Sequence, residues 1–175
     1  YSDLTTILNA IYAKTRQTGV LYQIRNVLYK ERKQQMTDVR DVLCEGGDAL
    51  YRIDYHYVQG TEMHGIIVGG NIRCLLKLSG TAYMPDLNGK ILLLESRSGT
   101  VARMETYLSQ LQQIGAFEQI AGILLGTFTE MEAKQCMPDI VQLVKKYVRK
   151  TMPIAVTKQI GHGTDAKGIV IGGEL

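Results

Sequence analysis

Residues 91–94 form an unbroken apolar run, Ile-Leu-Leu-Leu, and the next residue is the acidic Glu95. A strand that is apolar at every position, rather than at every second one, is typical of a sheet covered on both faces. Functional groups of such sheets tend to lie at the carboxyl ends of the strands. The run therefore predicts a buried strand that presents one carboxylate, Glu95, at the edge where ligands and catalytic groups gather.

The residues before this run predict a hinge, a helix and a turn. Gly69 and Gly70 allow the backbone to pass close to another group, and Asn71 is a good helix N-cap. Gly80 ends the helix, and a turn at residues 85–89 leads into the strand. The apolar face of the helix consists of Ile72, Leu75, Leu76 and Leu78.

Strands and helices alternate after residue 47, which favours the α/β class. Further strands are expected at residues 49–58, 63–68, 120–125, 152–156 and 169–171, and further helices at residues 100–114 and 138–150. A break at residues 45–48, Glu-Gly-Gly-Asp, predicts a domain boundary. We therefore expect residues 48–175 to form one α/β domain with a small sheet or barrel-like core.

Residues 1–47 are expected to hold two helices and a short strand at residues 20–22. Ser2 or Asp3 can cap the first helix. The second helix, at residues 30–44, is amphipathic with a charged outer face. The inward residues are Leu4, Ile7, Leu8 and Ile11 in the first helix and Met36, Val39, Val42 and Leu43 in the second.

Charge, length and cysteine content narrow the class of protein. The net charge of +3 is too small and too dispersed to favour nucleic acid as a partner. No apolar run approaches the ~20 residues of a membrane span. Cys44, Cys74 and Cys136 are odd in number and lack close spacing, which argues against zinc and a disulfide framework and favours a reducing compartment.

Ser2 has two interpretations, which share one geometry. By residue type alone it is a helix N-cap. A serine on a sharp turn into a helix is also an exposed nucleophile, and the helix N-terminus stabilises a neighbouring oxyanion. The backbone N–H of Asp3 would then be one oxyanion donor.

His162 and Glu95 are the matching candidates for a base and its acid. His162 lies between two glycines in a loop after a predicted strand, whereas His56 and His64 lie in or beside strand patterns. An imidazole is the usual base for a serine nucleophile. The order Ser2, Glu95, His162 is the order of serine hydrolases built on α/β sheets. A surface loop histidine and a solvated strand-end acid are the alternatives.

Five blocks of this sequence resemble the LD-carboxypeptidase family of serine peptidases, which includes the microcin-immunity peptidases. They are Tyr-Ser-Asp-Leu-Thr at residues 1–5, Gly-Gly-Asn at 69–71, Gly-Thr-Ala-Tyr-Met-Pro-Asp at 80–86, Gly-Lys-Ile-Leu-Leu-Leu-Glu at 89–95 and Ile-Gly-His-Gly at 160–163. Residues 112–126 also resemble the family's Gly-x-Phe…Ala-Gly-Ile-Leu-Leu-Gly block. The order and spacing of these blocks make the resemblance specific.

The resemblance implies a triad of Ser2, Glu95 and His162 that releases the terminal D-alanine from a cytoplasmic murein tetrapeptide in peptidoglycan recycling. It implies a homodimer with no cofactor and no metal. Gly70 and Asn71 are candidate substrate-binding residues. Arg73, Arg97 and Arg103 could each meet a substrate carboxylate. A peptidyl-nucleotide antibiotic is the alternative substrate, and a non-catalytic binding module is the alternative of another class.

The resemblance also implies that roughly a hundred residues of parallel α/β sheet precede Tyr1, so residues 1–47 would be the end of a nucleophile-bearing domain. As an isolated piece, the chain is then expected to be inactive or poorly folded, with exposed apolar surface. Two segments depart from the family pattern. Residues 96–99, Ser-Arg-Ser-Gly, lack a second acid, and residues 23–26 read Gln-Ile-Arg-Asn. Both departures bear on the choice of substrate.

Overall fold

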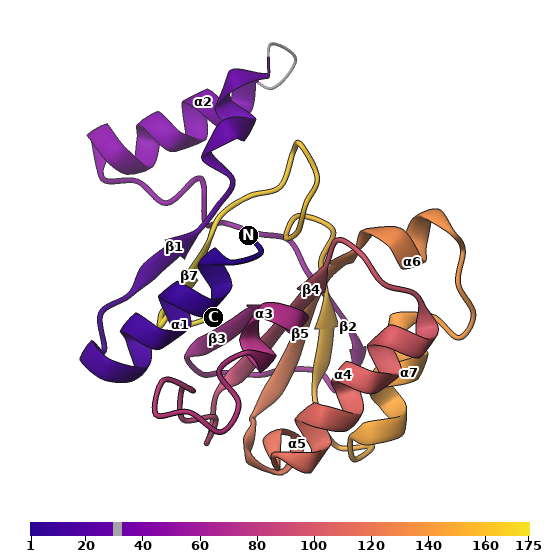
Figure 1. The fold of residues 1–175 in the computed structure, drawn as a ribbon. Coiled ribbons are helices and arrows are strands. Elements are labelled where there is room, and N and C mark those ends of the chain that lie inside the picture. Colours follow the sequence, from indigo (N-terminus) through magenta and orange to yellow (C-terminus); the bar gives the residue numbers. More distant parts are fainter. Residues whose placement is uncertain (30–32) are drawn as a thin grey trace.

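The computed structural model describes residues 1–29 and 33–175, and its centre is a five-stranded sheet (Figure 1). The strands lie in the order β2 (His56–Gln59), β6 (Ile154–Val156), β5 (Gly122–Phe128), β4 (Ile91–Ser96) and β3 (Ile67–Asn71). Strands β3 to β6 are parallel and β2 runs antiparallel to β6. This mixed, mostly parallel sheet confirms the α/β class predicted from the sequence.

The helices of the crossovers pack on one face of this sheet. The parallel strands follow one another in chain order, so right-handed crossovers place their helices on the same side. Helix α4 contacts both α3 and α7, and Figure 1 shows α4 and α7 side by side. The helices between β3 and β6 are α3 (Ile72–Leu76), α4 (Val101–Gln113), α5 (Ala116–Gln119), α6 (Thr129–Ala133) and α7 (Ile140–Tyr147).

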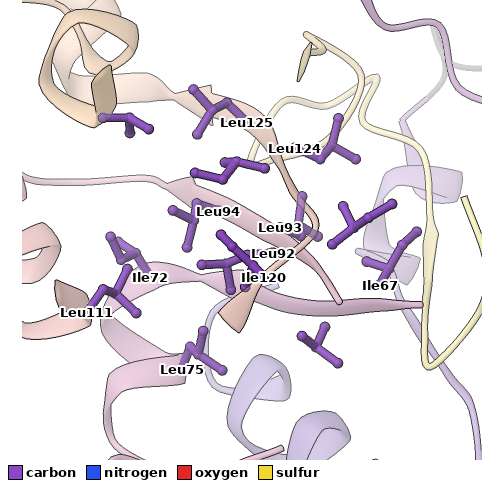
Figure 2. Close-up of a cluster of buried hydrophobic side chains, with 14 of the residues drawn as sticks. Ile67, Ile72, Leu75, Leu92, Leu93, Leu94, Leu111, Ile120, Leu124 and Leu125 are labelled. Carbon is purple, nitrogen blue, oxygen red and sulfur yellow. The ribbon is translucent and has the colours of Figure 1, made fainter. Parts of the chain in front are cut away.

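The core lies around β4 and β5, whose successive residues are buried whichever face they point to. This confirms the interpretation of the apolar run at residues 91–94 as a strand covered on both faces. Figure 2 shows the side chains of β4 among those of β5, α3 and α4. The labelled members are Leu92, Leu93, Leu94, Leu124, Leu125, Ile72, Leu75 and Leu111.

Strand β3 is at the edge of the sheet, and its outer side is closed by side chains of α1 (Leu4–Thr15). The amide of Asn9 donates to Gly69 O and accepts from Gly69 N, both at 2.8 Å. The hydroxyl of Thr5 accepts from Asn71 N at 3.0 Å. Asn9 thus replaces a neighbouring strand, which an edge strand otherwise lacks. A side chain at Gly70 would meet Thr5 Oγ1 at 2.7 Å, so the close approach of α1 needs glycine there.

The predicted inward face of α1 was wrong, because α1 packs against the polar edge of β3. Leu4, Ile7 and Ile11 are 43%, 52% and 40% exposed, and the fourth member, Leu8, is partly buried. The residues of α1 that are buried are Thr5, Asn9 and Tyr12. The edge of β3 needs hydrogen-bond partners, which the apolar side chains cannot supply. Gly69 and Gly70, predicted as a hinge, lie inside β3.

We expect the substitution Asn9→Leu to lower the free energy of unfolding by about 2–6 kcal/mol. Leucine keeps the shape but leaves the buried N–H and C=O of Gly69 without their partner, at about 1–3 kcal/mol for each unsatisfied group. Urea unfolding followed by circular dichroism measures the change. Gln112→Leu, an exposed amide on α4, is the control and should change stability by less than about 0.5 kcal/mol. Equal effects of the two substitutions would contradict this role of Asn9.

The first part of the chain contacts the last part. Strand β1 (Gly19–Leu21) pairs antiparallel with β7 (Ile169–Ile171), and both lie outside the five-stranded sheet. A small second cluster joins Tyr22, Val39 and Leu50. The other elements here are the 3-10 helix η1 (Ile24–Leu28), α2 (Lys33–Arg40) and the π-helix η2 (Asp41–Glu45). The boundary after residue 47 stays a prediction.

Three expectations for this part and its neighbours need correction. Met36 and Leu43 are exposed, because the small second cluster takes only Val39 and Val42 from that segment. The strand expected at residues 49–58 is reduced to β2. Residues 48–52 form a turn instead, in which Tyr51 N and Arg52 N donate to Asp48 O. The strand expected at residues 63–68 begins only at Ile67. Residues 30–32 of the expected second helix lie outside the described residues.

Candidate active site

Glu95 lies at the carboxyl end of β4 and is completely buried. On one side its register partner is Asn71 at the end of β3. On the other side a side chain at Gly126 of β5 would meet Glu95 Cβ at 3.1 Å and Ile160 O at 2.5 Å. Gly126 therefore leaves the space in which the loop that carries His162 reaches Glu95.

Both oxygens of the Glu95 carboxylate have a partner. Asn71 Nδ2 donates to Glu95 Oε1 at 2.9 Å. His162 Nδ1 lies 2.7 Å from Glu95 Oε2. An ionised carboxylate can only accept, so this contact places the proton of the neutral imidazole on Nδ1 and leaves Nε2 as the basic nitrogen. The sequence predicted this pairing of Glu95 with His162.

Asn71 fixes the acid and the start of α3 together. Its Oδ1 accepts from Cys74 N at 3.3 Å, which confirms the predicted N-cap, while its Nδ2 is taken by Glu95. Asn71 and Gly70 are buried and do not line the cleft described below. A contact of either residue with substrate stays a prediction.

The loop that carries His162 is held by residues to which the sequence analysis gave no role in the site. Gln23 Nε2 donates to Gly161 O at 3.3 Å, and Asn26 Nδ2 donates to Gly163 O at 3.2 Å. The ring of Tyr1 lies 5.9 Å from the ring of His162. Gln23 and Asn26 belong to the segment that departs from the family pattern, and nothing in their local sequence indicates these distant partners.

Tyr1 is a buried hydrogen-bond donor beneath the loop. Its hydroxyl donates to Lys167 O at 2.7 Å. Burial, and next the negative charge of Glu95, raise the pKa of the Tyr1 phenol above its usual value. The phenol therefore stays neutral and remains a hydrogen-bond donor to the backbone carbonyl of Lys167. This bond fixes the far end of the loop.

Ser2 lies on a strained turn at the start of α1. Its φ is 59°, a value uncommon for a residue with a side chain, and Ser2 O accepts from Thr5 N at 2.9 Å. Such a turn exposes a serine hydroxyl at a helix N-terminus. Among residues 1–29 and 33–175 the Ser2 hydroxyl does not cap α1, and its contact is with Cys74 Sγ at 3.9 Å.

Ser2 and His162 face the same open cleft, of about 380 Å³, together with Tyr1, Tyr22, Arg25 and Arg97. No hydrogen bond joins the Ser2 hydroxyl to the His162 ring among residues 1–29 and 33–175. The structure thus brings all three predicted catalytic residues to one place, with the acid–base pair in contact and the serine across the cleft. Hydrogen bonds to a nucleophile are often long before substrate binds.

Cys74 is not a competing nucleophile. It is fully buried, and burial raises the pKa of the thiol. A protonated thiol is a poor nucleophile.

Asp3 holds its side chain away from the cleft. Lys77 Nζ donates to Asp3 Oδ1 at 3.0 Å, and this bond, followed by the contact with Cys74, lowers the pKa of the carboxyl. No hydrogen bond within the described residues uses the Asp3 N–H. That N–H, next to Ser2, stays the predicted oxyanion donor.

The described residues offer no group of three or more His, Cys, Asp or Glu side chains that could hold a metal ion. Cys44, Cys74 and Cys136 are free. Of the helices in residues 1–29 and 33–175, none has the length and apolar character to cross a membrane. A buried carboxylate, an imidazole and a half-buried hydroxyl that lines an open cleft suit acyl transfer through a covalent intermediate.

Comparisons with known proteins identify a family and a fold. Residues 64–175 match the family model described as "LD-carboxypeptidase C-terminal domain". A protein of Treponema pallidum (strain Nichols), named "Putative carboxypeptidase", is 28% identical over all of this chain, which spans 59% of that relative. A similarly named protein of Vibrio cholerae is 30% identical over 72% of this chain and 46% of its own length.

Solved structures give the same fold. The microcin C7 self-immunity protein MccF superposes with a TM-score of 0.79 at 18% identity, over 99% of this chain and 62% of MccF. The muramoyltetrapeptide carboxypeptidase of Oxalobacter formigenes gives a TM-score of 0.79 at 18% identity, over 99% of this chain and 61% of the other. The chain therefore spans about three fifths of the length of these proteins.

Proposed function

The chain belongs to the LD-carboxypeptidase family, and from that membership we propose that it provides the catalytic residues of a serine peptidase that cuts an L–D amide bond. The observation that carries the proposal is the contact of Glu95 Oε2 with His162 Nδ1 at 2.7 Å, together with the cleft that His162 and Ser2 both line. A carboxylate that orients an imidazole towards a serine is the arrangement that activates a hydroxyl for attack.

In the proposed reaction Ser2 Oγ attacks the amide carbonyl and His162 Nε2 takes the hydroxyl proton. Glu95 holds the imidazole in the required tautomer and stabilises the imidazolium that forms. The N–H of Asp3 donates to the oxyanion. His162 then protonates the leaving amine, and water, activated by the same imidazole, hydrolyses the ester on Ser2.

For the substrate we propose a cytoplasmic murein tetrapeptide that loses its terminal D-alanine in peptidoglycan recycling, with the enzyme acting as a homodimer. The structural likeness to a muramoyltetrapeptide carboxypeptidase supports this choice. A peptidyl nucleotide is the second candidate, because MccF has the same fold and has been solved with glutamyl sulfamoyl guanosine and aspartyl sulfamoyl adenosine.

A fluorophosphonate probe and a two-substrate assay test the proposal on the whole protein, with any residues that precede Tyr1, as do the variants described below. We expect the probe to label Ser2, located by mass spectrometry of the digested protein, because an activated serine reacts with it and an ordinary helix-capping serine does not. We expect D-alanine to be released from the tetrapeptide faster than the amide of an aminoacyl sulfamoyl nucleotide is cut. The reverse order of rates would favour the second candidate. A folded protein with neither label nor turnover would instead indicate a binding module.

A further inference from the structure

Of the described residues, two arginines and no acid line the cleft that holds Ser2 and His162. The arginines are Arg25 and Arg97. The carboxylate of Glu95 is already bonded to His162 and Asn71, and that of Asp3, next to Ser2, is bonded to Lys77. Both arginines are exposed, and neither makes an ion pair within the part of the chain that the structure describes. The cleft thus carries positive charge beside the proposed nucleophile.

The position of each arginine is fixed by its neighbours. Arg25 NH2 donates to Gln23 Oε1 at 3.0 Å, and the same Gln23 amide donates to Gly161 O beside His162. Arg97 follows Glu95 by two residues, and its carbonyl accepts from Glu130 N at 3.1 Å. The neighbouring Gly99 N donates to Glu130 Oε2 at 2.6 Å. One guanidinium therefore comes from the loop braced against His162 and the other from the end of β4.

The other arginines considered from the sequence lie elsewhere. Arg73 contacts the sulfur of Cys74, and Arg103 lines a separate groove with Thr100 and Thr106. Of the three candidates for a carboxylate contact, only Arg97 lines the cleft of Ser2, and Arg25 joins it from outside that set.

We propose that Arg25 and Arg97 together bind the free α-carboxylate of the residue that the peptidase releases. This inference rests on the proposed function. In a carboxypeptidase only one Cα separates that carboxylate from the nitrogen of the bond to be cut, so its binding site must lie in the cleft of the nucleophile. Guanidinium groups bind carboxylates with two parallel hydrogen bonds and keep their charge at any working pH. The pair would restrict cleavage to the last residue of a peptide acid.

Equilibrium binding tests the pair without turnover. Calorimetry compares a murein tetrapeptide with the same peptide carrying a C-terminal amide, each bound to the Ser2→Ala protein. We expect the acid to bind at least about tenfold more tightly, and the added substitutions Arg25→Gln and Arg97→Gln to remove this preference. Adding Arg103→Gln instead, which removes the same charge outside the cleft, should leave the preference unchanged. Equal affinities for acid and amide in the Ser2→Ala protein would overturn the inference.

Steady-state kinetics gives the second measurement. In the protein with Ser2 present, each glutamine substitution should raise KM for the tetrapeptide acid about tenfold with kcat changed less than twofold, and Arg97→Lys should restore part of the loss. An unchanged KM in the Arg25→Gln, Arg97→Gln double variant would overturn the inference. A preference for the acid in binding with no turnover and no label on Ser2 would refute the proposed function and leave the carboxylate site standing.

Discussion

Replacing Ser2 by alanine is expected to lower kcat for tetrapeptide hydrolysis by at least about 10⁴-fold, because the reaction loses its nucleophile. The fold should survive the change. Within the described part of the chain the Ser2 hydroxyl caps no helix, and its contact with Cys74 Sγ, at 3.9 Å, is weak. Alanine adopts the φ of 59° at about the same cost as serine. The free energy of unfolding should therefore change by less than about 1 kcal/mol.

The measurement is the rate of D-alanine release, with urea unfolding of the same samples. Ser109→Ala on α4 is the matched control, and its rate should equal that of the unchanged protein. Cys74→Ala in the Ser2→Ala background tests whether the neighbouring thiol supplies residual activity. A Ser2→Ala protein that retains more than a tenth of the original rate would exclude Ser2 as the nucleophile and leave it as part of the turn into α1.

The features that the sequence predicted depend on neighbours close in the chain or on an unmistakable pattern. The apolar run at residues 91–94 needs no partner to be interpreted as a doubly covered strand, and the position of Glu95 after it follows. Asn71 as an N-cap needs only the helix that it precedes. Strand β7 was predicted with the bounds that the structure has, Ile169–Ile171, since glycines bracket three β-branched residues.

The features that the sequence could not predict depend on partners far along the chain. The apolar stripe of α1 predicted the wrong inward face, because the partner of α1 is the polar edge of β3, sixty residues later. The braces Gln23 and Asn26 reach the loop of His162 across 138 and 137 residues. The periodicity of a sequence does not indicate which distant carbonyl a side-chain amide will bond to. In these segments tertiary hydrogen bonding overrides local propensity.

Replacing Glu95 by glutamine is expected to lower kcat by about 10³–10⁴-fold with little change in the shape of the site. The carboxylate of Glu95 accepts two hydrogen bonds, from Asn71 Nδ2 and from His162 Nδ1. Glutamine has one oxygen and one NH₂ group. If its oxygen stays with Asn71, its NH₂ group faces His162 Nδ1, which must then accept and carry no proton. The proton of the neutral ring moves to Nε2, and this nitrogen can no longer take the proton of Ser2. In the serine protease triad, the change of the acid to its amide lowers kcat by about 10⁴-fold.

The tautomer of His162 separates this explanation from a merely structural effect. Nitrogen NMR of the imidazole should show the proton on Nδ1 in the unchanged protein and on Nε2 after Glu95→Gln. Asn71→Leu is the informative second variant, since it removes the other donor to Glu95 but leaves the carboxylate facing His162. That variant should keep the Nδ1 proton and lose less activity than Glu95→Gln. A Glu95→Gln protein with the Nδ1 tautomer and an unchanged rate would show that this buried acid has no part in orienting the base.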